Sequence, residues 1–129
     1  MGRKEKEMAE RDEYTPILKA LDAAGYFYSL RDYRGHGYQL VCVSNRSAAG
    51  RLHGRSFWLC KSSAQEWFVM TWGGDTAFII GDESLVAEVC VACLRHMRED
   101  KRIPDRIVEK YGLQPVDASR VRGFDIAPG

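Results

Sequence analysis

Apolar positions along this chain follow two different spacings, and the switch between them predicts its helices and strands. Between residues 15 and 24, apolar residues such as Ile17 and Leu21 recur at the spacing of an amphipathic helix. Thr15 is placed to cap this helix, and Gly25 suits the position just past its end. We therefore expect a first helix over residues 15–24.

Two further helices are predicted in the second half of the chain. Residues 84–98 carry an apolar stripe and follow Asp82, whose carboxylate suits the unpaired amide groups at a helix start. A shorter helix is expected from Pro104 to about Tyr111. Gly112 is suited to the left-handed conformation that ends many helices.

Between the first two helices the alternation changes to the two-residue spacing of β-strands. Strand-like runs cover residues 26–31, 38–43, 57–60, 66–72 and 76–80. Gly73 and Gly74 fit a two-residue hairpin loop, because both central positions of a type I′ turn need positive φ. Residues 44–55 are expected to form a longer polar connection.

This order of elements predicts an α+β fold (α-β-β-β-β-β-α-α). The connections are too short for crossover helices, so we expect a five-stranded antiparallel, meander-like sheet with the helices on one face. Residues 1–13 are expected to be a charged flexible lead-in, residues 14–113 one domain, and residues 114–129 a C-terminal tail, packed or loose. The predicted core contains Leu18, Leu21, Leu40, Leu59, Phe68, Met70, Phe78, Ile80, Val89 and Leu94.

The run at residues 66–72 places large apolar side chains on both faces of the sheet. Trp67 and Val69 point one way, and Phe68 points the other. A sheet with one wet face would alternate apolar with polar residues, so each face needs a cover. We expect a partner chain, first of all a second copy, to cover what the helices leave or to extend an exposed edge strand. The candidates for this partner surface are Trp58, Trp67 and Val69.

Composition describes an ordinary globular domain. The 129 residues are 45% hydrophobic and 29% charged. No apolar run approaches the roughly 18 residues that a membrane span needs, and the first residues lack the apolar region of a secretory signal. We expect a cytoplasmic protein without a membrane partner.

The net charge of +1 is unevenly distributed. Residues 31–61 contain six basic side chains against one acidic side chain, whereas residues 62–100 contain two against seven. Such polarity steers anionic partners, and glycines beside His36 and His53 let backbone amides approach an anion. Candidate anion-binding residues are Arg31, Arg34, His36, Arg46, Arg51, His53 and Arg55. Aromatic residues in the neighbouring strands make single-stranded nucleic acid the ligand class to test; ordinary solvated loops are the alternative.

Candidate chemistry is sparse. Cys90 and Cys93 form a C-x-x-C pair, but they lie on the apolar stripe of a predicted helix, as buried thiols do. Cys42 and Cys60 lack the paired spacing of a zinc site. We therefore assign no metal ligand and no cofactor.

A catalytic histidine pair is not expected either. In a meander, successive hairpin loops lie at opposite ends of the sheet, which separates His36 from His53 by roughly 17–20 Å. That distance is too long for proton transfer between them. The sequence identifies no catalytic residue.

The sequence thus favours a small non-catalytic binding or accessory protein that acts through protein–protein contacts as a homodimer. The alternative is binding of an anionic ligand or single-stranded nucleic acid through residues 31–61. An enzyme of unassigned class has the least support.

Overall fold

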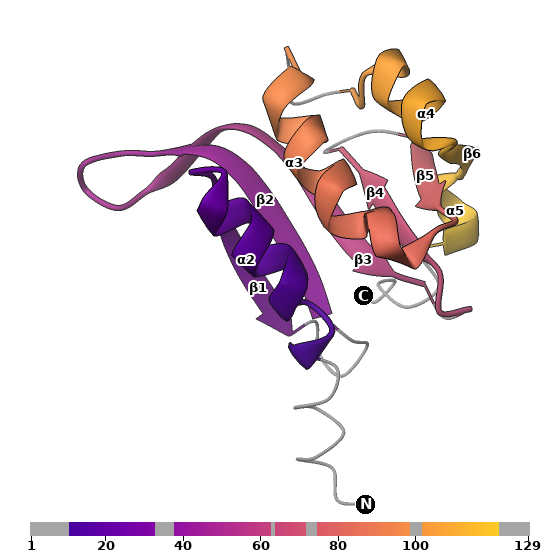
Figure 1. The fold of residues 1–129 in the computed structure, drawn as a ribbon, viewed down its shortest axis with the longest axis horizontal. Helices are drawn as coiled ribbons and strands as arrows, with labels where there is room; N and C mark the ends of the chain where they lie inside the picture. The colour runs from indigo at the N-terminus through magenta and orange to yellow at the C-terminus, as the bar shows by residue number, and fades with distance from the viewer. Residues whose placement is uncertain (1–10, 33–37, 63, 72–74, 99–101, 122–129) are drawn as a thin grey trace, which may run out of the picture.

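The computed structural model describes residues 11–32, 38–62, 64–71, 75–98 and 102–121. Within these residues one antiparallel sheet contains six strands in the order β1-β2-β3-β4-β5-β6, so each strand pairs with its neighbours in sequence. The predicted α+β class with an antiparallel sheet is confirmed (Figure 1). The predicted number of five strands is wrong.

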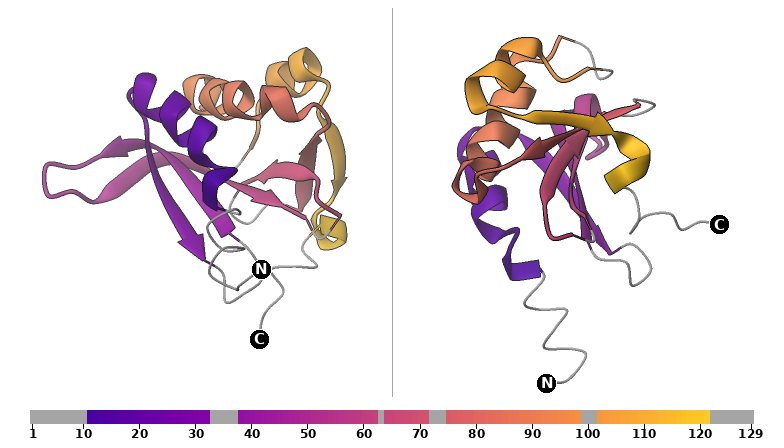
Figure 2. Two further views of the ribbon diagram at one scale, coloured as in Figure 1. Left: turned by 60° about the horizontal axis from the view of Figure 1, so that its bottom comes forward. Right: turned by 90° about the vertical axis from the view of Figure 1, so that its right-hand side faces the viewer.

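The strands are β1 (Phe27–Asp32), β2 (Tyr38–Arg46), β3 (Leu52–Lys61), β4 (Trp67–Met70), β5 (Thr76–Ile80) and β6 (Gln114–Asp117). The helical elements are α2 (Thr15–Ala23), the 3-10 helix η1 (Glu83–Leu85), α3 (Val86–His96), α4 (Asp105–Tyr111) and α5 (Ala118–Val121). Helices α2, α3 and α4 lie on one side of the sheet, and α5 lies on the other (Figure 2).

Local chemistry explains most helix ends. The Asp82 carboxylate accepts a hydrogen bond from the Ser84 backbone amide at 2.9 Å, as the sequence predicts. Gly112 ends α4 with φ 60°, in the expected left-handed conformation. The predicted cap at Thr15 is wrong, because Thr15 already lies in the helix and Tyr14 precedes it.

The sheet divides the core into two clusters. Beneath the helices the buried side chains include Leu21, Leu40, Phe57, Leu59, Ile80, Val89 and Leu94. On the opposite face a smaller cluster contains Cys60, Phe68, Met70, Ala77 and Ala118. The predicted core is confirmed, except that Leu18 and Phe78 are only partly buried.

The sixth strand comes from the segment in which the sequence showed no clear spacing. β6 pairs antiparallel with β5 from Gln114 opposite Ile79 to Asp117 opposite Thr76. The strand is short and mostly exposed, so it lacks the apolar alternation that marks the other strands. Part of the predicted tail thus belongs to the sheet.

A second correction concerns residues 44–55. These residues do not form a long loop, because β2 continues to Arg46 and β3 begins at Leu52. Asn45 pairs with His53 across the two strands. Three predicted features lie wholly or partly outside the described residues: residues 1–10 of the lead-in predicted over residues 1–13, the hairpin glycines Gly73 and Gly74, and residues 122–129 of the tail.

Candidate interaction surfaces

The ends of β2 and β3 and the loop between them, residues 44–55, form a hairpin that projects beyond the helices (Figure 1). We call this segment the arm. Its turn is closed by a hydrogen bond from the Gly50 amide to the Ser47 carbonyl at 2.8 Å, and Gly50 has φ 87°. A tight turn followed by a left-handed glycine is a common hairpin connection. The arm therefore has a defined backbone.

A β-bulge marks the base of the arm. The pairing shifts between Val43 and Asn45, and Gly54 on the facing strand has φ 96°. The buried Ser44 hydroxyl accepts a hydrogen bond from the Arg55 amide at 2.9 Å. A Cβ atom at position 54 would lie 2.5 Å from the Ser44 Oγ. Glycine is required here both for its conformation and for its small size.

Arg55 ties the same point to the helices. Its Nη1 donates a hydrogen bond of 2.8 Å to the backbone carbonyl of Met97, which is the residue that caps the C-terminus of α3. Cations are favoured at a helix C-terminus, where carbonyl groups have no helical partner. Although the sequence suggested Arg55 as an anion ligand, the structure gives its guanidinium this structural contact.

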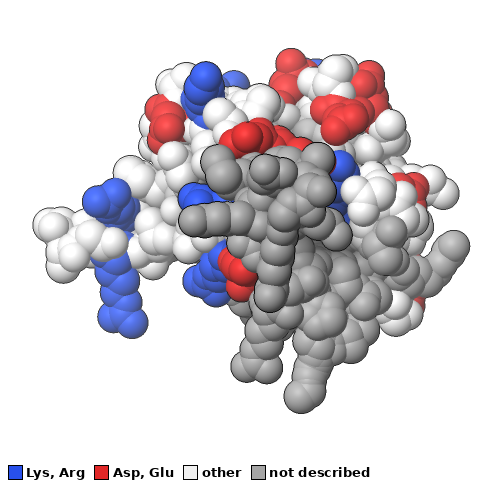
Figure 3. Space-filling model, turned by 90° about the horizontal axis from the view of Figure 1, so that it is seen from below, with Lys and Arg blue, Asp and Glu red and all other residues white. Residues whose placement is uncertain are grey.

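The other basic residues of the arm are exposed. Arg46, Arg51 and His53 lie at the surface, and the Arg46 guanidinium is 5.8 Å from the centre of the Phe27 ring. The arm contains no acidic residue. Seen from below, Lys and Arg side chains stand out on this projecting end, with no Asp or Glu beside them (Figure 3). The arm is thus a basic surface.

Of the remaining anion-binding candidates, only Arg31 lies in the described part of the chain. Arg31 is exposed on β1, a different strand of the sheet. Arg34 and His36 lie outside the described residues, so the distance between His36 and His53 stays a prediction.

Two of the predicted partner-surface residues belong to the core. Val69 is fully buried beneath the helices, and Trp67 keeps only 4% of its surface exposed. The Trp67 ring packs edge-on against Tyr14, with 5.1 Å between ring centres, and Lys61 lies over it at 5.2 Å. Trp67 and Val69 are therefore wrong as partner-surface candidates, because the helices and the segment before α2 already cover them.

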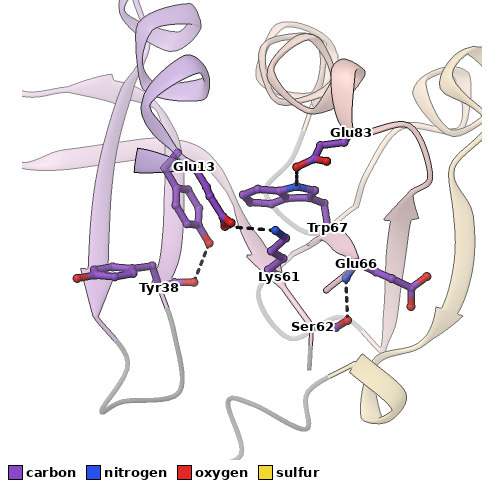
Figure 4. A network of polar contacts seen from close by, with 8 residues as sticks. Glu13, Tyr38, Lys61, Ser62, Glu66, Trp67 and Glu83 are labelled. Atoms are coloured by element: carbon purple, nitrogen blue, oxygen red, sulfur yellow. Dashed lines mark hydrogen bonds and ion pairs between the residues drawn. The ribbon is translucent and has the colours of Figure 1, made fainter. Parts of the chain in front are cut away.

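Polar contacts hold this cover in place. Glu13 forms an ion pair with Lys61 at 3.2 Å, and the Trp67 Nε1 donates a hydrogen bond to Glu83 at 3.4 Å (Figure 4). The Tyr14 hydroxyl donates to the Tyr38 carbonyl at 2.8 Å. Burial raises the pKa of the Tyr14 hydroxyl, which keeps it protonated as a donor.

Trp58, the third candidate, lies on the opposite face of the sheet. It is half-buried and packs against the smaller cluster that contains Phe68 and Met70. Because Phe68 and Met70 are themselves buried, the smaller cluster offers little open apolar surface. A partner is therefore not needed to cover a whole second face.

The two edges of the sheet differ strongly. β6 is four residues long, contains Pro115 and runs directly into α5. Proline donates no ladder hydrogen bond and commonly protects an edge strand. β1 is six residues long, contains no proline and pairs with β2 in an uninterrupted register. The outer side of β1, which we call the β1 edge, pairs with no described strand.

A small hollow lies between α2 and β1. The described residues that line it are Arg11, Asp12, Thr15, Leu18 and Leu30. Leu18 and Leu30 are half-buried, whereas the polar members are exposed. Further along β1, the Tyr28 hydroxyl donates a hydrogen bond to the Asp22 carboxylate at 3.1 Å. Both polar and apolar side chains thus lie beside the β1 edge.

The cysteines are buried thiols, as the sequence predicts. Cys90 and Cys93 lie within α3 in the core, and burial raises the pKa of both thiols. A raised pKa disfavours the reactive thiolate. Among the described residues no group of three His, Cys, Asp or Glu side chains is arranged to hold a metal ion.

Comparison with known proteins adds no further constraint. No protein-family model, curated protein or solved structure matches this chain. In the described part of the chain, no helix is long and apolar enough to cross a membrane. The arm and the β1 edge, as described above, are the two surfaces that we consider as candidates for function.

The sequence signals for these two surfaces are of unequal strength. The charge of the arm is visible in the sequence, because residues 44–55 contain three of the six basic side chains of residues 31–61 and no acidic one. The β1 edge has only an indirect signal, the proline at position 115 that marks the other edge. Sequence order alone does not say which strand ends the sheet.

Proposed function

We propose that this protein is a non-catalytic binding protein that acts through protein–protein contacts and self-associates as a homodimer. The observation that carries the proposal is the unequal protection of the two sheet edges. β6 is short, contains Pro115 and leads into α5, whereas no proline, shortening or following helix among the described residues protects β1. An unprotected edge offers a row of backbone donors and acceptors to another strand.

The first four residues of β1 strengthen this proposal. Residues 27–30 are uncharged and half-buried, and charge begins only at Arg31. Natural edge strands commonly use charged side chains or bulges to resist pairing. The β1 edge therefore has the composition of a strand that accepts a partner.

Light scattering on the full chain at micromolar concentrations tests the proposal. We expect a mass of twice the 14.7 kDa of one chain. A mass of one chain throughout the concentration range would refute self-association. Loss of the dimer on dilution, with an unchanged circular dichroism spectrum, would show that the monomer folds independently.

The arm supports a second candidate function, binding of an anionic polymer such as single-stranded nucleic acid. The observation that favours it is the exposure of Arg46, Arg51 and His53 on a projecting hairpin without acidic residues. Arginines that neutralise phosphates release counterions, so the affinity falls with salt.

Titration of a labelled single-stranded oligonucleotide at low and moderate salt tests this candidate. We expect the double variant Arg46→Ala and Arg51→Ala to bind more weakly and with a smaller salt slope, by about 0.7 for each lost phosphate contact. Arg95→Ala, an exposed arginine on α3, is the matched control. Equal affinity of the arm variant and the control would exclude the arm as the binding surface.

A further inference from the structure

We infer that two copies pair through their β1 strands, antiparallel and centred on Ser29, so that the sheets join across a two-fold axis. This inference rests on the proposed self-association and names its surface. It follows from the β1 edge, which pairs with no described strand, from the hollow beside it, and from the charged residues in and next to that hollow.

Symmetry restricts how two β1 strands can pair. A homodimer interface is self-complementary, so each residue pair occurs twice around the axis, except where a residue faces its own copy on the axis. Opposite residues of an antiparallel pair point to the same face of the sheet, and successive residues alternate between faces. A two-fold rotation about an axis perpendicular to the sheet keeps each residue on its own face. One residue must therefore lie opposite its own copy, and the axis passes midway between these two copies.

Charge selects among these positions. An axis at Arg31 would set two like charges directly opposite each other, which is unfavourable. An axis at Leu30 would bring the partner's Asp32 opposite Tyr28, whose hydroxyl already contacts the Asp22 carboxylate. This axis is unfavourable because it would bring two carboxylates towards the same tyrosine. An axis at Ser29 avoids both conflicts and pairs residues 27–31 completely.

The Ser29 axis also matches apolar groups. It sets Tyr28 opposite the partner's Leu30, on the face of the sheet that α2 covers. On the other face it sets Phe27, whose ring centre already lies 5.8 Å from the Arg46 guanidinium, opposite the partner's Arg31. The pairing of Tyr28 with the partner's Leu30 is of a kind that stabilises sheets.

Charge complementarity next to β1 supports the same arrangement. Leu30 lines the hollow together with two charged residues of opposite sign, Arg11 and Asp12. The partner's Tyr28, placed opposite Leu30, carries the partner's Asp22 with it through the hydrogen bond between these two residues. The arrangement brings the partner's Asp22 towards the hollow, where Arg11 is the group of opposite charge with which we expect it to pair; symmetry forms this contact twice.

The pairing also places the two copies of α2 beside each other. A two-fold axis perpendicular to the joined sheet keeps both copies of α2 on the same face. Leu18 of α2 lines the hollow and stays half-buried in the single chain. Close approach of the second α2 would bury Leu18 further.

Cross-linking tests the axis directly. In Ser29→Cys, two thiols would face each other across the axis, with Cβ atoms about 4.5–5.5 Å apart before adjustment. We expect oxidised glutathione to convert this variant into a covalent dimer on a non-reducing gel, while the native cysteines stay buried. Ser119→Cys, at an exposed position of α5, is the matched control and should stay monomeric on the gel.

A charge swap tests the contact beside the hollow. Arg11→Glu alone and Asp22→Arg alone should each raise the dimer dissociation constant about tenfold, because two exposed ion pairs become repulsive. The double variant should restore the dissociation constant to within about threefold of the unmodified chain. Tyr28→Phe keeps the Asp22 charge and separates its effect from loss of the hydrogen bond.

The outcomes separate this inference from the proposed function. A dimer in which Ser29→Cys forms no cross-link and the charge swap has no effect overturns the β1 pairing and leaves self-association intact. A chain that is monomeric in light scattering overturns both. Cross-linking at position 29 together with rescue in the double variant establishes the axis.

Discussion

The covered part of β2 and β3 and the arm belong to the same pair of strands, yet they meet opposite environments. Residues 39–44 of β2 are all buried, whereas Asn45 and Arg46 are exposed. The change occurs where the strands pass beyond the helices that cover the sheet (Figure 1). Burial along a strand therefore depends on which elements pack against it. The uncovered end of this strand pair carries polar and basic residues.

The boundary between these two regions is fixed by a few contacts. Ser44 receives the Arg55 amide, Gly54 provides the positive φ of the bulge, and Arg55 reaches the end of α3. Bulges bend strands and increase their twist. These contacts set the direction in which the arm leaves the domain.

The largest effects are expected in the covered region. Phe57→Ala and Phe68→Ala remove fully buried rings from opposite faces of the sheet, and each should lower the free energy of unfolding by about 3–5 kcal/mol. Urea denaturation measures both. A loss below about 1 kcal/mol for Phe68→Ala would show that its face is not a closed core.

A smaller loss is expected at the boundary. Gly54→Ala should cost about 2–3 kcal/mol, because left-handed backbone strain is joined by crowding against the Ser44 Oγ. Gly50→Ala is the matched control: its φ is also positive, but a Cβ atom there would meet no atom within 4 Å, so about 1 kcal/mol is expected. Equal losses for both variants in urea denaturation would show that close packing at Gly54 is unimportant.

The link from the arm to α3 ranks next. Arg55→Met keeps most of the side-chain bulk and removes the hydrogen bond to the Met97 carbonyl, so we expect a loss of about 1–2 kcal/mol. Thermal denaturation of this variant and of Arg55→Lys measures the contact. Unchanged stability in Arg55→Met would show that this hydrogen bond does not stabilise the fold, and Arg55 would again be a candidate anion ligand.

The smallest effect is expected at the tip of the arm. Arg51 is exposed, so Arg51→Met should change stability by less than about 0.5 kcal/mol in the same thermal measurement. A larger loss would show that the tip contributes to folding, and the contrast between the covered strands and the arm would then be smaller than the burial pattern indicates.

Local and repetitive features of the fold are predictable from the chain itself. The carboxylate at position 82 and the glycine at position 112 act within a few residues, so their roles do not depend on distant partners. The helical spacing through Val89 and Leu94 identified residues that the structure buries. The charge of residues 31–61 is likewise a property of composition.

The tertiary structure decided everything that depends on pairing between distant segments. Residues 114–117 form a strand only because they pair with β5. Likewise, Asn45 belongs to β2 because it pairs with His53 on β3. Trp67 is core because Tyr14, far away in sequence, packs on its ring. Strand pairing and burial are non-local, and a residue's own spacing does not encode its partner. For the same reason, only the finished sheet shows that β1 is an edge strand, with β2 as its one neighbour among the described strands.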